Sequence, residues 1–155
     1  MIYKSINKLN TTLSSIGVGT GIGGFQAKYA EYPSKQIKGI QLAIDLGVNF
    51  IDTAEEYGNG QAEINVGKSI KGNRDNIFIG TKLSSKNYKK KSLIKSAEDS
   101  LKRMKIDYID LYQLHWPNPL IDLEETTDGL MSLIEENKIK YVGVSNFSLV
   151  EIERF

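Results

Sequence analysis

Short runs of β-branched and aromatic residues alternate with amphipathic helical patterns along most of the chain. We expect five such runs to be strands. None of them alternates cleanly between apolar and polar residues, which is typical of strands covered on both faces. The runs are SIGVG (15–19), VNFI (48–51), IFIGT (77–81), YIDLYQL (108–114) and YVGVS (141–145). Strands that alternate with helices form βαβ units, so the sequence predicts an α/β fold with a parallel sheet.

The segments between these runs have the periodicity of amphipathic helices. Ser34 is expected to cap the first helix, which should end at Gly47, and a fifth helix should begin near Ser148. The segment before the first strand, about 1–14, is predicted to be a β-hairpin. The apolar stripes of the first four helices are Ile37, Ile40 and Ile44; Ala62, Val66 and Ile70; Leu93, Ala97, Leu101 and Met104; and Leu123, Leu130 and Ile134.

The composition limits the class of protein. Of the 155 residues, 40% are apolar and 25% are charged, which excludes a disordered or fibrous chain and is typical of one soluble domain over 1–155. The net charge of +1 provides no overall field that would attract nucleic acid or a membrane surface, so neither is expected as a partner. The chain has no cysteine and no apolar signal segment at its N-terminus, which favours a cytoplasmic location.

Polar residues follow the predicted strands at the end where parallel sheets carry their chemistry. The carboxyl ends of parallel strands share one side of the sheet, so these residues should converge in space. Taken singly each has an ordinary structural explanation: Asp52 could cap a turn, Lys82 could lie at the surface and Tyr57 could be packing. Together they indicate a site. The residues are Thr20, Asp52, Lys82, His115 and Trp116, and Ser145 and Asn146, with Tyr57 five positions after Asp52.

A phenol, an ammonium, a carboxylate and an imidazole are suited to the reduction of a carbonyl group. A phenol keeps its proton up to a pKa of about 10, and a nearby ammonium lowers that pKa by stabilising the phenolate. Lys82 could supply the ammonium beside Tyr57, and Asp52 could hold Lys82 in place. His115 could donate a hydrogen bond to an oxygen beside the phenol. The hydride must come from a cofactor, because no side chain carries one.

Four segments of the sequence resemble, in order, the signature segments of the aldo-keto reductases. They are FIDTAEEYGNGQAEINVG (50–67), IFIGTKL (77–83), SLKRMKIDYIDLYQLHWP (100–117) and KIKYVGVSNFS (138–148). The resemblance implies a TIM-type (β/α)₈ barrel, NADPH as cofactor, a small-molecule carbonyl substrate and no metal. It extends over nearly all of the 155 residues.

The resemblance also implies roles for individual residues. Tyr57 would be the general acid, and Lys82 would lower its pKa. Asp52 would pair with the lysine beside the cofactor, and His115 would orient the substrate carbonyl. The remaining implied contacts are Ser145 and Asn146 with the nicotinamide carboxamide, Thr20 with the cofactor, and Trp116 with the substrate.

The length of the chain is at odds with a complete barrel. Eight βα units typically need about 250 residues, roughly 100 more than are present. We therefore expect five of eight strands, interior side chains that meet water, and open sheet edges that favour self-association. The chain could be an active reductase. It could instead be a truncated and inactive chain, a binding or regulatory module, or one that needs a partner chain.

One motif favours another fold. GTGIGG (19–24) satisfies the glycine pattern of dinucleotide-binding Rossmann folds. In those folds a helix opens directly on the glycines, so that its N–H groups meet the pyrophosphate. FQAKYAEYP (25–33) follows here without a helical apolar stripe, so we expect a flexible loop at the end of the first strand instead.

Overall fold

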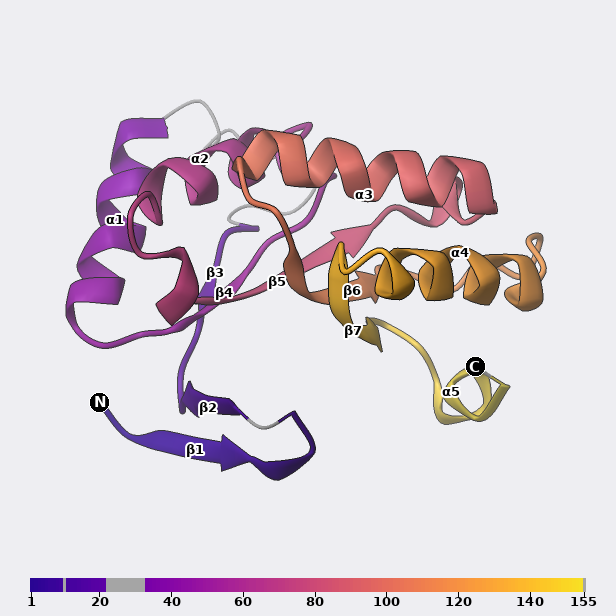
Figure 1. Ribbon diagram of the computed structural model, residues 1–155, viewed down its shortest axis with the longest axis horizontal. Coiled ribbons are helices and arrows are strands. Elements are labelled where there is room, and N and C mark those ends of the chain that lie inside the picture. Colours follow the sequence, from indigo (N-terminus) through magenta and orange to yellow (C-terminus); the bar gives the residue numbers. More distant parts are fainter. Residues whose placement is uncertain (10, 22–32, 155) are drawn as a thin grey trace.

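A five-stranded parallel sheet forms the centre of the molecule (Figure 1). The computed structural model describes residues 1–9, 11–21 and 33–154. The strands run in the order β3-β4-β5-β6-β7, so each strand pairs with its neighbour in sequence. Their bounds are β3 Val18–Gly19, β4 Phe50–Asp52, β5 Phe78–Leu83, β6 Ile109–Leu114 and β7 Ile139–Val144. The predicted fold class, five strands of a (β/α)₈ barrel preceded by a hairpin, is confirmed.

Helices connect the parallel strands, as βαβ units require. The connecting helices are α1 Pro33–Asp45, α2 Gln61–Ser69, α3 Lys90–Met104 and α4 Leu123–Glu135, with the 3₁₀ turns η4 Arg74–Asn76 and η5 Ser85–Asn87. A further helix, α5 Leu149–Arg154, follows β7. No helix within the described segments has the length and apolar character needed to cross a membrane.

Several predicted elements are wrong at their starts: the first strand begins at Val18 rather than at Ser15, and the second at Phe50 rather than at Val48. Ser34 does not cap α1, because the helix already includes Pro33, and proline suits the first helical position, where its missing N–H is not needed. The fifth strand begins at Ile139 rather than at Tyr141. The start of α5 near Ser148 is confirmed: the Ser148 backbone N–H and hydroxyl both donate to Glu151 Oε2, at 2.7 and 2.6 Å.

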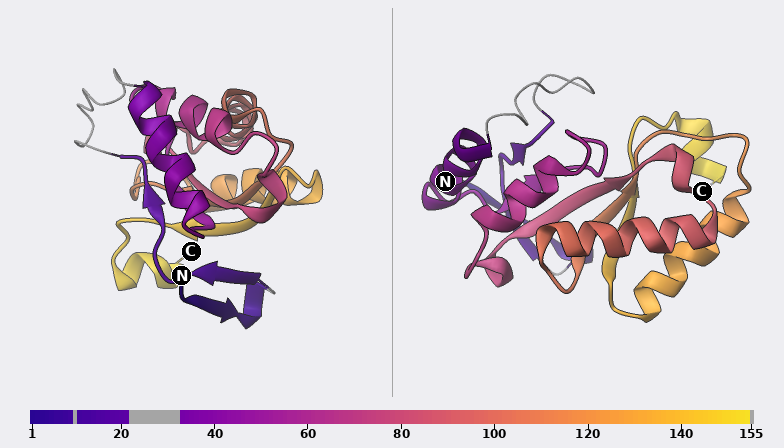
Figure 2. Two further views of the ribbon diagram at one scale, coloured as in Figure 1. Left: turned by 90° about the vertical axis from the view of Figure 1, so that its left-hand side faces the viewer. Right: turned by 90° about the horizontal axis from the view of Figure 1, so that it is seen from above.

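The N-terminal hairpin stands apart from the body formed by the sheet and helices (Figure 2). Strands β1 (Tyr3–Ile6) and β2 (Thr11–Ser14) pair antiparallel through the turn η1 (Asn7–Leu9), as predicted. Asn49 ties this hairpin to the amino end of β4. Its side-chain oxygen accepts from Ser14 N at 2.7 Å, and its Nδ2 donates to Thr12 O at 2.9 Å.

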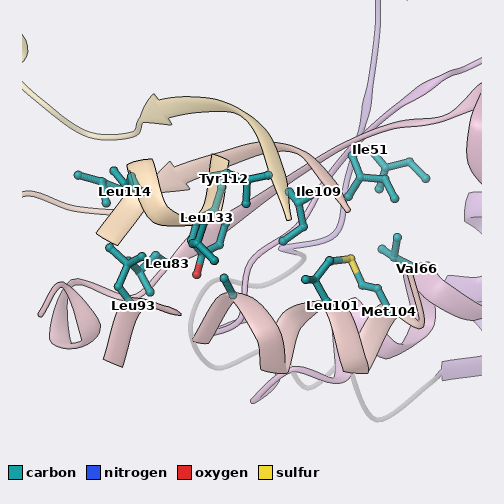
Figure 3. Close-up of a cluster of buried hydrophobic side chains, with 14 of the residues drawn as sticks. Ile51, Val66, Leu83, Leu93, Leu101, Met104, Ile109, Tyr112, Leu114 and Leu133 are labelled. Carbon is teal, nitrogen blue, oxygen red and sulfur yellow. The ribbon is translucent and has the colours of Figure 1, made fainter. Parts of the chain in front are cut away.

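The hydrophobic core lies between one face of the sheet and helices α2, α3 and α4 (Figure 3). Ile51, Ile79 and Leu114 contribute from the strands and are fully buried. The helices supply the predicted stripes, of which the α3 stripe is buried along its whole length. Burial of these faces, at roughly 25 cal/mol per Å² of apolar area, is what holds the helices on the sheet.

Aromatic side chains lie together on the other side of the sheet. Phe50 and Phe78 meet edge to face with ring centroids 5.9 Å apart, and Phe78 stacks on Tyr141 at 6.3 Å. Phe78 is only 8% exposed, while Phe50 and Tyr141 are half-buried. The expectation that interior side chains meet water is therefore wrong for Phe78, because the rings cover one another.

Candidate active site

The register of the sheet brings the predicted site residues to one end. Beyond the strands, Thr20 N donates to Asp52 O at 2.9 Å, His115 N to Leu83 O at 3.1 Å, and Ser145 N to Leu114 O at 2.8 Å. These backbone bonds continue the ladders by one residue. They fix where each polar side chain leaves the sheet.

Lys82, at the carboxyl end of β5, is the centre of the cluster. Its Nζ lies 2.6 Å from Asp52 Oδ2, 3.0 Å from Thr53 O and 3.4 Å from the Tyr57 hydroxyl. The lysine is only 6% exposed. A buried ammonium needs a charge partner and acceptors for its protons, and these three oxygens provide them.

Tyr57 is presented by a turn between β4 and α2. Three consecutive residues after it, Gly58, Asn59 and Gly60, have positive φ values of 59°, 51° and 84°. Glycine adopts this left-handed conformation without strain, and asparagine tolerates it better than most residues. The GNG sequence thus reverses the chain directly after the phenol. Tyr57 can therefore lie only five residues after the end of β4 at Asp52 and still place its hydroxyl beside Lys82.

Gly21 lies against the Tyr57 ring from the β3 side. A β-carbon added at Gly21 would lie 2.8 Å from the ring carbon that bears the hydroxyl. No side chain fits there while the ring keeps its place. The residues that follow, 22–32, lie outside the described residues. The loop predicted in place of a Rossmann helix falls largely within that range.

His115 closes the cluster from the end of β6 and is 4% exposed. Its ring meets that of Tyr57 edge to face, with centroids 5.7 Å apart, and stacks on Trp116 at 6.2 Å. Its Nδ1 lies 3.0 Å from Glu56 Oε2. Burial lowers the pKa of His115, the Lys82 charge lowers it further, and the Glu56 carboxylate opposes both.

The remaining predicted residues surround this cluster. Asn146 has a φ of 63°, and its Nδ2 donates to His115 O at 2.9 Å and to Ser145 Oγ at 3.0 Å. Thr20 is buried and its hydroxyl donates to Asp52 O at 3.1 Å. Trp116 is 42% exposed, with its ring stacked on His115. The structure therefore brings the predicted phenol, ammonium, carboxylate and imidazole together.

The sequence prediction missed two acids directly before Tyr57. Glu55 Oε1 accepts from Ser84 N at 2.6 Å, and Glu56 Oε1 accepts from Ser84 Oγ at 2.9 Å. Both carboxylates thus bind the segment that follows β5, and Glu56 also reaches His115. Their position next to Tyr57 was the one feature of the sequence that could have indicated a role for these two acids. Position alone does not show in which direction a loop side chain points.

A buried ion pair supports the sheet on its helical side. Glu63 is fully buried, and it accepts from Arg103 Nε and from the Thr81 hydroxyl, both at 2.6 Å. Burial raises the pKa of Glu63 more than the Arg103 charge lowers it. Thr81 precedes Lys82 on β5, so this network fixes the strand that carries the lysine. In the described parts of the chain, no three His, Cys, Asp or Glu side chains are grouped to hold a metal ion.

Comparison with known proteins gives consistent matches. A family model described as "Aldo/keto reductase family" matches residues 15–155. "Aldo-keto reductase YhdN" of Bacillus subtilis (strain 168) is 42% identical over 166 residues, which cover 100% of this chain and 50% of that protein. "Methylglyoxal reductase DkgA" of Escherichia coli (strain K12) is 41% identical over 138 residues, covering 86% of this chain and 47% of that protein.

Solved structures share the fold. A crystal structure of an aldo-keto reductase from Klebsiella pneumoniae in complex with NADPH superposes with a TM-score of 0.87 at 33% identity, covering 99% of this chain and 53% of that one. The chain spans about half the length of the curated relatives it matches.

Proposed function

The chain belongs to the aldo-keto reductase family, and from this premise we propose that it carries the proton-transfer site of an NADPH-dependent reductase acting on a small aldehyde or ketone. One observation carries the proposal. The Tyr57 hydroxyl lies 3.4 Å from Lys82 Nζ, which is itself held by Asp52 at 2.6 Å. A general acid and the charge that assists it are thereby paired, with the lysine buried and the tyrosine half-buried.

Tyr57 is the proton donor in this proposal. When the carbonyl oxygen gains negative charge, the phenol transfers its proton to that oxygen, and a phenolate remains. The Lys82 ammonium stabilises the phenolate charge, and it is screened little because the lysine is buried. Asp52 keeps the ammonium in place through both stages.

His115 and Trp116 form the substrate side of the site. The edge-to-face contact between the Tyr57 and His115 rings holds the imidazole beside the phenol, so an oxygen between them meets two polar groups. Trp116 offers an apolar wall next to that position. The relative DkgA is named as a methylglyoxal reductase, and small carbonyl compounds of that type suit a site of this kind.

NADPH, when bound, supplies the hydride. Ser145 and Asn146 fit its nicotinamide carboxamide. The Ser145 oxygen accepts from Asn146 and keeps its own proton to donate, while Asn146 uses its amide nitrogen internally and leaves its amide oxygen to accept. The pair thus offers one donor and one acceptor, which complements a carboxamide. Thr20 and Asp52 are assigned to the cofactor as well, and they are joined to each other because the Thr20 backbone N–H and hydroxyl both donate to Asp52 O.

Replacing Tyr57 by Phe tests the proposal. The chain should oxidise NADPH in the presence of methylglyoxal or 4-nitrobenzaldehyde, and Tyr57→Phe should lower kcat roughly 10²–10⁴-fold, because the proton donor is lost. Tyr108→Phe is the matched control. Tyr108 precedes β6 at the opposite end of the sheet, and its ring contacts with Arg74 and Lys140 are retained by Phe.

The open sheet favours a second candidate, a binding or regulatory module that uses the same residues without turnover. Binding of NADPH by the chain with no carbonyl-dependent oxidation would support this candidate. Turnover that survives in Tyr57→Phe would contradict the role of Tyr57.

A further inference from the structure

The hydroxyl of Tyr88 is bonded to both polar groups of the Trp116 backbone. It donates to Trp116 O at 2.5 Å and accepts from Trp116 N at 3.3 Å. Tyr88 lies between η5 and α3, is 1% exposed and packs in the hydrophobic core. A buried hydroxyl needs partners, and the two bonds use its proton and one of its lone pairs. The core thus holds the backbone of Trp116 through this phenol.

Tyr88 is itself held in place and keeps its proton. Burial raises the pKa of Tyr88 more than its hydrogen bond to Trp116 lowers it, so the hydroxyl remains a donor at neutral pH. Its backbone oxygen accepts from the hydroxyl of Thr126 at 3.2 Å. Thr126 is a fully buried residue of α4, so a helix of the core fixes the residue that supports Trp116.

Trp116 belongs to the loop between β6, which ends at Leu114, and α4. Side chains and backbone groups bind this loop to the segment that joins β5 to α3. Asn118 Nδ2 donates to Ser85 O at 2.7 Å, and the Tyr88 hydroxyl binds at Trp116. The second of these contacts is made at the residue that carries the indole, so it decides where the indole leaves the loop.

The indole of Trp116 is only partly enclosed. It stacks on His115 with ring centroids 6.2 Å apart, yet the residue is 42% exposed. Packing restricts a side chain of this exposure weakly, because part of its surface meets solvent rather than neighbouring atoms. The position of the indole therefore depends on the backbone that Tyr88 holds.

We infer that Tyr88 is a positioning residue that holds the Trp116 indole at the substrate side of the site and thereby strengthens the binding of substrates large enough to rest on it. For the reaction this rests on the proposed function, in which Trp116 is an apolar wall. An ordered wall binds an aromatic aldehyde without first losing conformational freedom. Methylglyoxal has too little apolar surface to gain from the wall.

The fluorescence of Trp116 tests the contact without cofactor or substrate. The sequence contains one tryptophan, so this indole gives the whole tryptophan emission. Tyr88→Phe keeps the buried ring and removes both hydrogen bonds. The anisotropy of the emission should fall and its quenching by acrylamide should rise, because fast motion of the indole is no longer restricted. Tyr108→Phe, at the opposite end of the sheet, is the control and should change neither. Equal anisotropy and quenching in Tyr88→Phe and the parent would overturn the inference.

Hydrogen exchange of the unsubstituted chain provides a test for the case in which Tyr88→Phe does not fold. The Trp116 amide donates to the Tyr88 hydroxyl, and this bond must open before the amide exchanges. Exchange should therefore be at least roughly tenfold slower than in an unfolded peptide. An amide that exchanges at the rate of an unfolded peptide would overturn the inference without any variant.

Substrate size separates a positioning role from a general loss of stability. In Tyr88→Phe, KM for 4-nitrobenzaldehyde should rise roughly three- to tenfold, about the worth of one hydrogen bond, while kcat and KM for methylglyoxal stay within about twofold. Trp116→Ala should also raise KM for the aromatic aldehyde. Adding Tyr88→Phe to Trp116→Ala should change nothing further, because Tyr88 acts through the indole. Additive effects of the two substitutions would contradict the inference.

Failure of this inference and failure of the proposed function give different results. Equilibrium dialysis of 4-nitrobenzaldehyde allows the same comparison of variants in a chain without turnover. Weaker binding by Tyr88→Phe in an inactive chain would remove the proposed function and leave the role of Tyr88 standing. A reductase with the same KM for 4-nitrobenzaldehyde in Tyr88→Phe and the parent would overturn the inference alone.

Discussion

At the scale of single residues, the ends of strands were predictable and the directions of loop side chains were not. Asp52 ends β4, Lys82 is the last residue but one of β5 and His115 directly follows β6, and parallel pairing requires such residues to share one end. Glu56 lies in a turn whose path depends on three left-handed residues after Tyr57. Its contact with His115 therefore depends on a backbone conformation that apolar patterning does not encode.

Gly21 provides a test of how tightly the phenol is placed. Gly21→Ala would put a β-carbon 2.8 Å from the Tyr57 ring, so the ring must shift from its present place beside Lys82. The turnover of a carbonyl substrate should fall by at least roughly tenfold, because small displacements of reacting groups are costly. Gly19→Ala is the control, since a β-carbon there meets nothing within 4 Å. Equal activity in the two variants would contradict the placement.

At the scale of elements, the apolar stripes identified all four long helices, and one of the missed strand boundaries has a specific reason. The predicted strand, 141–145, left Lys140 outside it. In the structure Lys140 belongs to the strand. Its Nζ lies 3.2 Å from Asp110 Oδ1 and 3.7 Å from the centre of the Tyr108 ring, both on the neighbouring chain segment. Cross-strand partners of this kind are not visible along one strand of sequence.

The packing of α2 on α3 depends on a glycine. A β-carbon at Gly67 would lie 2.1 Å from the backbone oxygen of Met104, so Gly67→Ala must separate the two helices. We expect a loss of roughly 1–3 kcal/mol or more in the free energy of unfolding. Gly39→Ala in α1 meets nothing within 4 Å and should stabilise the chain by about 0.4–1 kcal/mol. Urea denaturation measures both, and a Gly67→Ala variant as stable as the parent would contradict the close approach.

At the scale of the whole molecule, the described strands form an open sheet whose outer members are β3 and β7. The outer sides of such strands carry backbone N–H and C=O groups that can pair with another chain. This arrangement followed from strand counting alone. The burial of the aromatic rings against one another on the interior side could not be predicted by counting strands. It depends on how residues of three different strands are placed relative to one another.

Self-association of the chain follows from these edges. Sedimentation velocity should show species larger than the monomer that increase with protein concentration. The reason is backbone pairing along β3 or β7, so the association should persist at high salt, where surface ion pairs are screened. A single monomeric species at every concentration would contradict it.

The hairpin and the candidate active site lie at opposite ends of the sheet. Before β4 starts, Gly47 accepts a hydrogen bond from the hairpin strands and Asn49 donates one to them, and Asp52, where β4 ends, is paired with Lys82. A fluorophore or affinity tag joined to Met1 would therefore lie at the opposite end of the sheet from the candidate active site. Labelled protein should exchange its ligands as quickly as bare protein does.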